Sequence, residues 1–285
     1  MNNIKFGPAG NSESFEKSGY KSTLFAPEYV AAMGLNAYEY QCGHGVRVNA
    51  EAAQKFKENA DAFGVTVSLH APYFISLCSL DEVKRDNSVG YILDSARAVL
   101  ALGGTRLVIH PGGLSGQART DALSMTIDTL LRAHRALCEE GLERAVICPE
   151  TMGKTNQLGD IHEVAAMCRA EESFVPCIDF GHLNARTSGG IKTQRDYEDI
   201  FDILENAIGK ERTREFHSHF SKIEYTQIGG EKRHLTFADK LFGPDYEPFL
   251  ETVYKRGYTP TVICESAGTQ AEDALTMKEY FKNIR

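Results

Sequence analysis

The sequence lacks the features that would indicate secretion, membrane insertion or a nucleotide-binding fold. None of its seven cysteines forms a CxxC pair, and the odd number argues against both a disulfide framework and a thiolate zinc site. No apolar run approaches the roughly 18 residues that a membrane span needs, and the N-terminus resembles no signal peptide. The glycine-rich segments lack the spacing of a nucleotide fingerprint. We therefore expect a soluble, cytoplasmic, monomeric protein with no membrane partner and no nucleotide cofactor.

Positive charge is also scarce. The net charge is −8, the pI is near 5.6 and there is no lysine or arginine run. A broad electrostatic surface for nucleic acid is therefore not expected, although metal ions or single arginines could still hold phosphate groups. The 285 residues are 42% hydrophobic and 25% charged, which is a globular composition of the size of one α/β barrel. We predict a single domain over residues 1–285.

Short β-rich segments recur at intervals of roughly 30 to 45 residues, with helical patterns between them. Asn49 and Gly64 bound one such helix, because asparagine caps helix N-termini and glycine ends helices. Asp160 and Glu163 form a capping signal for another helix near 161–170. Eight strand-then-helix units without a linker predict an α/β fold, namely a single (β/α)8 TIM barrel. The eight strands are predicted to begin at residues 4, 37, 65, 106, 145, 175, 214 and 261.

Acidic and imidazole side chains gather at the C-terminal ends of these predicted strands, where TIM barrels carry their catalytic residues. A single histidine at a strand end is more often structural than a ligand. Many carboxylates and imidazoles at one rim, however, would repel and desolvate one another unless a cation compensates. We therefore predict a metal site formed from His70, His110, Glu150, Asp179, His182, His217, His219 and Glu265, with His234 in the loop after the seventh strand.

The ligand types narrow the choice of metal. Imidazole and carboxylate without thiolate suit zinc, and also manganese or iron. A catalytic zinc takes about three protein ligands, so this residue set suffices for two or three ions. Bridged metals suit phosphoester hydrolysis, because one ion generates hydroxide near neutral pH while others hold the phosphoryl oxygens.

Seven short motifs resemble, in the same order, those of the endonuclease IV family of apurinic/apyrimidinic endonucleases, which has a xylose-isomerase-like TIM barrel. The resemblance implies a three-zinc enzyme that hydrolyses the DNA backbone 5′ to an abasic site through a metal-bridging hydroxide. The partner that it implies is DNA with an abasic site. The motifs are "SLHAPY" (68–73), "IHPGG" (109–113), "PET" (149–151), "CIDFGH" (177–182), "HFSK" (219–222), "KRH" (232–234) and "ES" (265–266).

The resemblance also implies a ligand set. His70 and His110 would bind the first metal together with Glu150, which would bridge to the second metal. Glu150 and Glu265 are the residues expected to carry catalysis. The second site would be completed by Asp179, His219 and Glu265.

The third site departs from the family pattern. His182 and His234 would bind the third metal, but the family motif is Asp-x-His and Lys232 occupies its aspartate position. Glu231 could substitute from the adjacent position. Otherwise the site is weak or empty, and Lys232 replaces part of its charge. Tyr73 would fill or stack at the abasic gap.

Two alternatives stay open at this point. Glu150, Asp179, His219 and Glu265 equally resemble the single-metal site of sugar isomerases and epimerases, in which two glutamates flank the substrate for proton transfer. That alternative leaves the other imidazoles unexplained, so we favour the phosphodiesterase. His217 and His219 share one strand face, and we expect His219 to be the ligand while His217 orients it from one layer deeper. Aligning the motif on Lys222 instead would exchange these roles.

Overall fold

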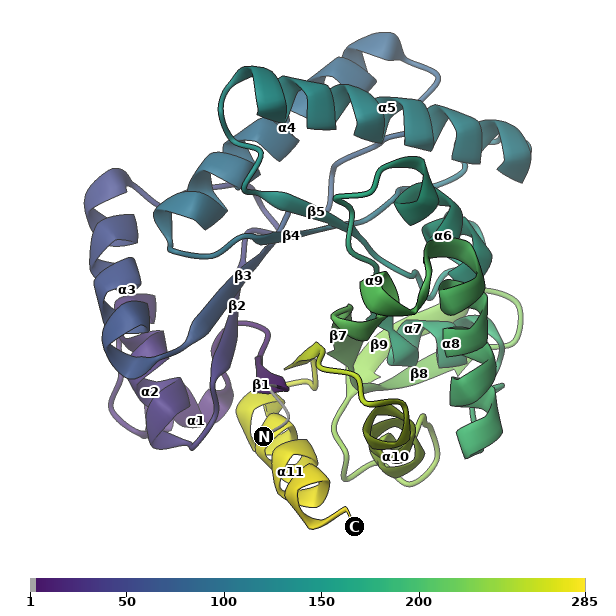
Figure 1. Ribbon diagram of the computed structural model, residues 1–285. Helices are drawn as coiled ribbons and strands as arrows, with labels where there is room; N and C mark the ends of the chain where they lie inside the picture. Colours follow the sequence, from purple (N-terminus) through teal and green to yellow (C-terminus); the bar gives the residue numbers. More distant parts are fainter. Residues whose placement is uncertain (1–3, 285) are drawn as a thin grey trace.

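Parallel strands form the wall of a barrel in the computed structural model, which describes residues 4–284 (Figure 1). Two four-stranded sheets, in the orders β1-β10-β7-β6 and β2-β3-β4-β5, make up this wall. Isolated bridges from Ala9 to Glu39 and from Glu150 to Cys177 join the two sheets. The barrel strands are β1 (Lys5–Pro8), β2 (Ala37–Gln41), β3 (Thr66–His70), β4 (Arg106–Ile109), β5 (Val146–Pro149), β6 (Cys177–Asp179), β7 (His217–Phe220) and β10 (Thr261–Cys264). The predicted TIM barrel is confirmed, while residues 1–3 and 285 of the predicted domain lie outside the described part.

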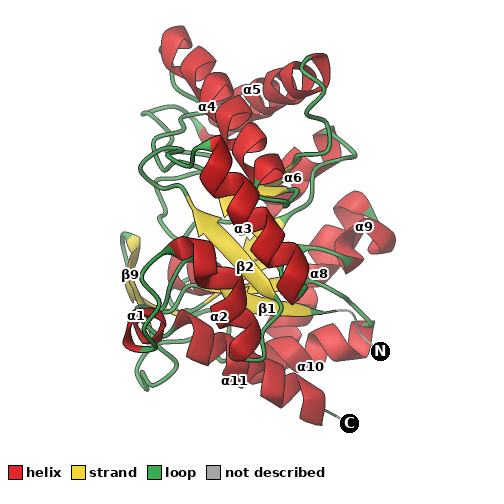
Figure 2. Cartoon of the chain, turned by 90° about the vertical axis from the view of Figure 1, so that its left-hand side faces the viewer, coloured by secondary structure: helices red, strands yellow, loops and turns green. Residues whose placement is uncertain are grey.

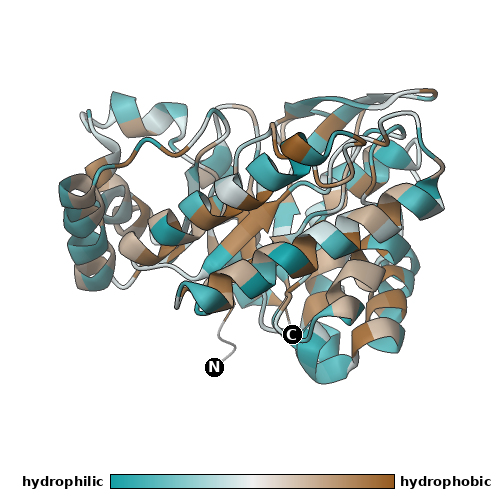
Figure 3. Cartoon of the chain, turned by 90° about the horizontal axis from the view of Figure 1, so that it is seen from above, coloured by the Kyte–Doolittle hydropathy of each residue, from teal (hydrophilic) through white to brown (hydrophobic). Residues whose placement is uncertain are grey.

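Helices surround the strands and present polar faces outward, while hydrophobic residues colour the strands at the centre (Figure 3). None of the helices described within residues 4–284 is both long and apolar enough to cross a membrane. The helical elements are α1 (Glu13–Lys17), η1 (Thr23–Phe25), α2 (Ala26–Ala32), α3 (Ala50–Phe63), α4 (Glu82–Ala101), α5 (Arg119–Glu139), α6 (Ile161–Ala170), α7 (Phe180–Arg186), α8 (Gln194–Ile208), α9 (Lys210–Arg214), α10 (Tyr246–Arg256) and α11 (Gln270–Asn283).

Two helices begin and end where their capping residues predict. The Asn49 side chain accepts a 2.8 Å hydrogen bond from the backbone N–H of Ala52, and Gly64 ends α3 in the left-handed conformation. Asp160 and Glu163 form a complete capping box at the start of α6. These local interactions satisfy backbone groups that a helix end leaves without partners.

A β-hairpin that the sequence reading missed projects from the barrel after β7. It consists of β8 (Lys222–Thr226) and β9 (Gly230–Leu235), and it lies at the opposite end of the barrel from the chain termini (Figure 2). His234 therefore lies in a strand, and its predicted place in a loop is wrong. The sequence pattern predicts His182 at the end of a strand, but His182 lies in α7, because the chain turns into a helix directly after Asp179.

Close contact between β1 and β2 depends on Gly7. A Cβ atom at this position would lie 1.8 Å from the backbone oxygen of Ala37. The clash cannot be relieved by rotating a side chain, because the oxygen belongs to the backbone. We expect Gly7→Ala to lower the free energy of unfolding by about 3 kcal/mol through overpacking. The urea midpoint of the far-UV circular dichroism signal measures this loss.

Gly90 in α4 is the control position, because it has open space around its Cβ position. Gly90→Ala should raise the free energy of unfolding by about 0.5–1 kcal/mol. Equal midpoints for the two variants would contradict this account of the β1–β2 contact.

Candidate metal centre at the barrel mouth

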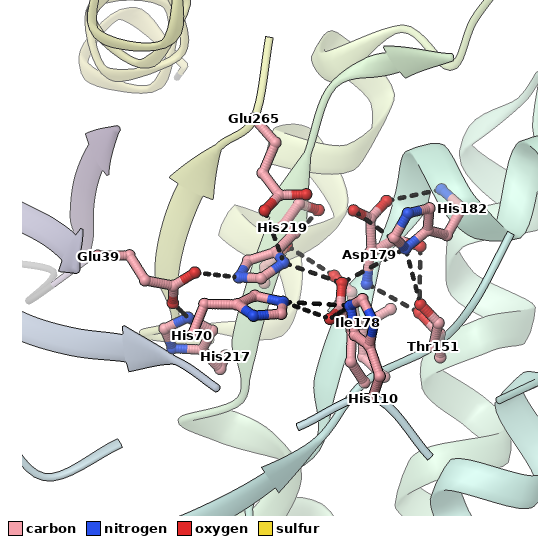
Figure 4. Close-up of polar contacts among 12 residues, drawn as sticks. Glu39, His70, His110, Thr151, Ile178, Asp179, His182, His217, His219 and Glu265 are labelled. Atoms are coloured by element: carbon pink, nitrogen blue, oxygen red, sulfur yellow. Dashed lines mark hydrogen bonds and ion pairs between the residues drawn. The ribbon is translucent and has the colours of Figure 1, made fainter. Parts of the chain in front are cut away.

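A cavity of about 540 Å³ opens at the C-terminal ends of the barrel strands. Its lining includes most of the side chains that the sequence singled out. The ionisable ones come from the ends of barrel strands, from α7 and from the hairpin, and Figure 4 shows four of them, His70, His110, His182 and Glu265, in one region. The full set is His70, His110, His182, Glu231, His234 and Glu265.

The first cluster consists of His70, His110 and Glu150. One ligand atom from each lies within 4.8 Å of the others. Oε2 of Glu150 lies 3.3 Å from Nε2 of His70 and 3.0 Å from Nε2 of His110. Both imidazoles thus point Nε2 toward the same carboxylate oxygen of Glu150. Three side chains that bind one metal ion would be arranged in this way.

The second cluster consists of Glu150, Asp179, His219 and Glu265, with ligand atoms also within 4.8 Å of one another. Nδ1 of His219 lies 3.0 Å from Oε1 of Glu150 and 3.5 Å from Oε1 of Glu265. Glu150 therefore belongs to both clusters, with one oxygen toward each. This sharing is what a bridging carboxylate between two ions requires.

The charges in these clusters compensate one another. Burial acts most strongly on Glu150 and raises its pKa, but His219 and His110 outweigh this effect and hold the pKa well below its usual range. Burial lowers the pKa of His182, but Asp179 and Glu150 reverse the shift and raise that pKa well above its usual value. The buried carboxylates thus favour the protonated, positively charged form of the imidazoles. A bound metal cation would supply the compensating positive charge instead.

The environment of the Asp179 carboxylate suits a bound cation. Among residues 4–284, its fully buried Oδ2 has no hydrogen-bond partner, while Oδ1 accepts from the backbone N–H of His182 at 2.6 Å. Burial raises the pKa of Asp179 to about 6, against the opposing charge of His182. The nearest cationic group to Oδ2 is Nδ1 of His182 at 3.4 Å. A buried carboxylate oxygen without a hydrogen bond is costly, and a hard or borderline cation is the ligand that this donor set suits.

The third cluster consists of His182, Glu231 and His234, again with ligand atoms within 4.8 Å. Nε2 of His182 lies 3.5 Å from Oε2 of Glu231. The hairpin reaches the cluster because Gly153 and Gly230 let two backbones touch. The Glu231 N–H donates to the Gly153 carbonyl at 3.1 Å, and a Cβ on Gly230 would lie 2.1 Å from that oxygen.

A β-bulge explains why Glu231 faces the cavity. The register of the hairpin pairs Glu224 with Arg233 and then Tyr225 with Glu231, which leaves Lys232 as an extra residue. In a regular strand, residues 231 and 234 would point to opposite faces, and one inserted residue brings them to the same face. Lys232 points away and pairs with Glu224. In this register Glu231, and not Lys232, belongs to the third cluster.

The structure separates the two histidines of β7. His219 lies in the second cluster, as we favoured, whereas Nε2 of His217 turns away from the cavity and lies 2.9 Å from Oε2 of Glu39. Sequence reasoning missed Glu39, a fully buried carboxylate on β2. The alternation of side chains along β2 could have identified Glu39. Tyr38 and Tyr40 both pack on Phe56 of α3, outside the barrel. Glu39 lies between them in the strand, so its side chain points to the barrel interior.

Tyr73 lies at the mouth beside the first cluster. Its ring stacks on His110 at a centroid distance of 5.5 Å, and 54% of the residue is exposed. Gly43 makes room for it, since a Cβ there would lie 2.2 Å from Tyr73 Cε2. An aromatic ring that is held beside the cavity yet open to solvent is available for stacking with a ligand.

Comparison with known proteins places the chain among barrels of one kind. The family model described as xylose isomerase-like TIM barrel matches residues 27–284. An uncharacterized protein of Methanocaldococcus jannaschii, MJ0133, is 35% identical over 278 residues, which are 96% of each chain. A probable endonuclease 4 of Mycoplasma pneumoniae is 24% identical over 245 residues, covering 84% of this chain and 78% of the relative.

Solved structures share the fold at lower identity. Endonuclease IV from Thermus thermophilus superposes with a TM-score of 0.69 at 17% identity, covering 99% of this chain and 100% of the other. A D-tagatose 3-epimerase-like protein also superposes with a TM-score of 0.69, at 20% identity, covering 98% and 96%. At these identities the likeness shows the barrel alone.

Proposed function

Because this chain belongs to the xylose isomerase-like TIM barrel family, we propose that it is a metal-dependent phosphodiesterase of the endonuclease IV type. Its substrate would be DNA with an abasic site, cut on the 5′ side of that site. The metal would be zinc in two or three sites, with manganese or iron as alternatives. This proposal joins the residue clusters of the barrel mouth to one reaction.

The observation that supports the proposal most is that three ligand clusters, rather than one, meet at the barrel mouth within the described residues 4–284. A single-metal isomerase needs only the carboxylates and imidazole of the second cluster. The isomerase leaves the first and third clusters unexplained, although they include the buried groups His70 and His182, and buried charged groups are costly for a fold to retain. Phosphodiester hydrolysis uses them, because attacking oxygen, phosphoryl oxygens and leaving oxygen all carry negative charge.

Each cluster has a definite task in this proposal. Glu150 would hold both the first and the second metal, and Asp179 and Glu265 would complete the second site. Glu231 would supply the anionic ligand of the third site. When bound, the ions would act as Lewis acids that lower the pKa of bound water and stabilise negative charge on the phosphoryl oxygens. Glu150, Asp179 and His219 are fully buried, which strengthens electrostatic interactions with their side chains.

The relatives support the same reaction. The chain aligns over 84% of its length with the probable endonuclease 4 of Mycoplasma pneumoniae, and further relatives of this name come from Mycoplasma genitalium and Aquifex aeolicus. We infer that this chain carries out a hydrolytic chemistry of the kind that these names imply.

The deciding experiment is incubation with a labelled duplex that carries one abasic analogue, in the presence of zinc or manganese. We expect a single nick 5′ to the analogue that leaves a 3′-hydroxyl end, and no nick in the matching intact duplex. Absence of nicking under both metals would remove the DNA-repair assignment.

An isomerase remains the second candidate, because the second cluster alone has the composition of a single-metal sugar site and a D-tagatose 3-epimerase-like structure shares the fold. Metal analysis of the purified protein distinguishes the two functions. Two or three zinc ions per chain support the phosphodiesterase. One manganese or magnesium ion per chain, without a second occupied site, would favour the isomerase.

Tyr73 gives a prediction about substrate binding. We expect Tyr73→Ala to weaken binding of the abasic duplex about tenfold or more, because base–aromatic stacking contributes ~1–3 kcal/mol. Fluorescence anisotropy of a labelled duplex measures this change. Phe63 is an exposed aromatic residue of α3 outside the cavity lining, so Phe63→Ala is the matched control and should bind like wild type. Equal affinities for the two variants would show that Tyr73 makes no substrate contact.

A further inference from the structure

Beneath the second cluster lies a set of buried polar groups that belong to none of the three clusters at the barrel mouth. Glu39 of β2, Ser68 of β3 and His217 of β7 are all nearly or completely inaccessible to solvent. Figure 4 shows the Glu39 carboxylate between the rings of His217 and His219. Burying a carboxylate in a barrel core is costly unless every oxygen has a partner, so its placement calls for an explanation.

Both oxygens of Glu39 are occupied. Oε2 accepts hydrogen bonds from Ser68 Oγ and from Nε2 of His217, each at 2.9 Å. Oε1 lies 2.9 Å from Nε2 of His219 and accepts from Gln41 Nε2 at 3.3 Å. The carboxylate is thus held in one orientation, with one oxygen anchored by the barrel core and the other directed at a ring of the second cluster.

The two ring nitrogens of His219 therefore face different environments. Nδ1 points to Glu150 and Glu265 in the second cluster, and Nε2 points to Glu39. A neutral imidazole carries its proton on one nitrogen and offers a lone pair on the other. With the proton on Nε2 beside Glu39, the lone pair of Nδ1 is directed at the position where the second metal would bind.

We propose that Glu39 is a positioning residue for the metal centre, which fixes the tautomer and ring orientation of His219, with His217 and Ser68 holding Glu39 in place. The proposal rests on the metal centre of the proposed function, but not on the reaction catalysed there. It extends the centre to β2, a strand that contributes no residue to the first, second or third cluster.

A fourth ion in this region is a poorer explanation. Cys177, His217 and His219 also lie within ligand distance of one another, but burial raises the pKa of the Cys177 thiol well above its usual value, so the thiol is not a ready ligand. Nε2 of His217 already donates to Glu39. The group is fully buried, so we assign it to support rather than to metal binding.

Glu39→Gln tests the proposal, because glutamine keeps the shape of the side chain and removes its charge. We expect the affinity of the second site for zinc to fall about 10- to 100-fold, the range for removing the outer partner of a metal ligand. Competition with a chelator measures this loss, and a changed d–d absorption spectrum of the cobalt-substituted protein would report the altered ligand field. Glu163 is another buried glutamate with fixed hydrogen bonds, located at α6 away from the cavity, so Glu163→Gln serves as the control and should bind zinc like wild type.

A second measurement needs no variant at Glu39. The ¹⁵N shifts of the zinc-loaded wild-type protein should show His219 protonated on Nε2 and metal-bound through Nδ1. The opposite tautomer, or unchanged zinc affinity and cobalt spectrum in Glu39→Gln, would overturn the proposal. Wild-type protein that binds no metal would instead overturn the metal centre of the proposed function, which is a different result. Ser68→Ala, which removes one anchor of Glu39, should weaken zinc binding by a few-fold and substitutes if Glu39→Gln does not fold.

Discussion

Replacing Glu150 by glutamine is expected to lower the rate of nicking at least about 10³-fold, which corresponds to ~4 kcal/mol of transition-state stabilisation. The reason is that each carboxylate oxygen belongs to a different cluster. Oε2 lies 3.0 Å from His110 and Oε1 lies 3.0 Å from His219. Glutamine would turn one oxygen into an NH₂ group, a donor that cannot bind a cation, so one of the two sites loses its shared ligand.

Metal content makes this prediction specific. Glu150→Gln should weaken both the first and the second site, whereas Glu265→Gln should weaken the second alone, because Glu265 belongs to the second cluster only. Elemental analysis after dialysis should therefore give fewer ions per chain for Glu150→Gln than for Glu265→Gln. Circular dichroism would establish that both variants are folded. A Glu150→Gln protein with wild-type metal content and activity would refute a bridging carboxylate.

A matched pair of variants tests the third site. Glu231→Gln is expected to reduce third-site zinc occupancy and to slow nicking at least about tenfold, because that site would lose its anionic ligand. Lys232→Gln should leave both quantities nearly unchanged, since Lys232 is exposed and pairs with Glu224. Metal analysis and the nicking rate measure both effects.

This pair distinguishes the structure from the plain sequence pattern. The Asp-x-His motif aligns Lys232 with the ligand, whereas the bulge of β9 presents Glu231. A larger loss in Lys232→Gln than in Glu231→Gln would mean that the hairpin adopts the regular register when metal binds.

Much of the candidate site can be predicted from the sequence, because several of its residues lie at or directly after the C-terminal ends of strands. His70 ends β3, while His110 and Glu150 directly follow β4 and β5. Once these segments are identified as parallel barrel strands, their C-terminal ends must meet at one rim. The cap of Asn49 and the capping box of α6 are similarly local, so they could be predicted without knowledge of distant contacts.

The remaining features depend on contacts that no local pattern contains. Glu39 meets His217 across 178 residues of chain, so its partner is known only when the barrel closes. The inserted Lys232 changes the face on which Glu231 lies, and a bulge of one residue leaves little trace in the alternation of side chains. His182 reaches the cavity from a helix because the chain bends after Asp179, and a strand-based reading cannot show that bend.

The two isolated bridges that join the sheets imply that metal binding would also stabilise the barrel. Glu39 and Glu150 are the residues whose backbones pair across the two seams between the half-barrels, and both of their carboxylates meet at His219. The first cluster comes from one half-barrel, and Asp179, His219 and Glu265 come from the other. Ions bound there would cross-link the halves through Glu150 and would stabilise the closed barrel by ~2.7 kcal/mol at a concentration of 100 Kd. Metal depletion would then switch off the enzyme and loosen its scaffold in the same step.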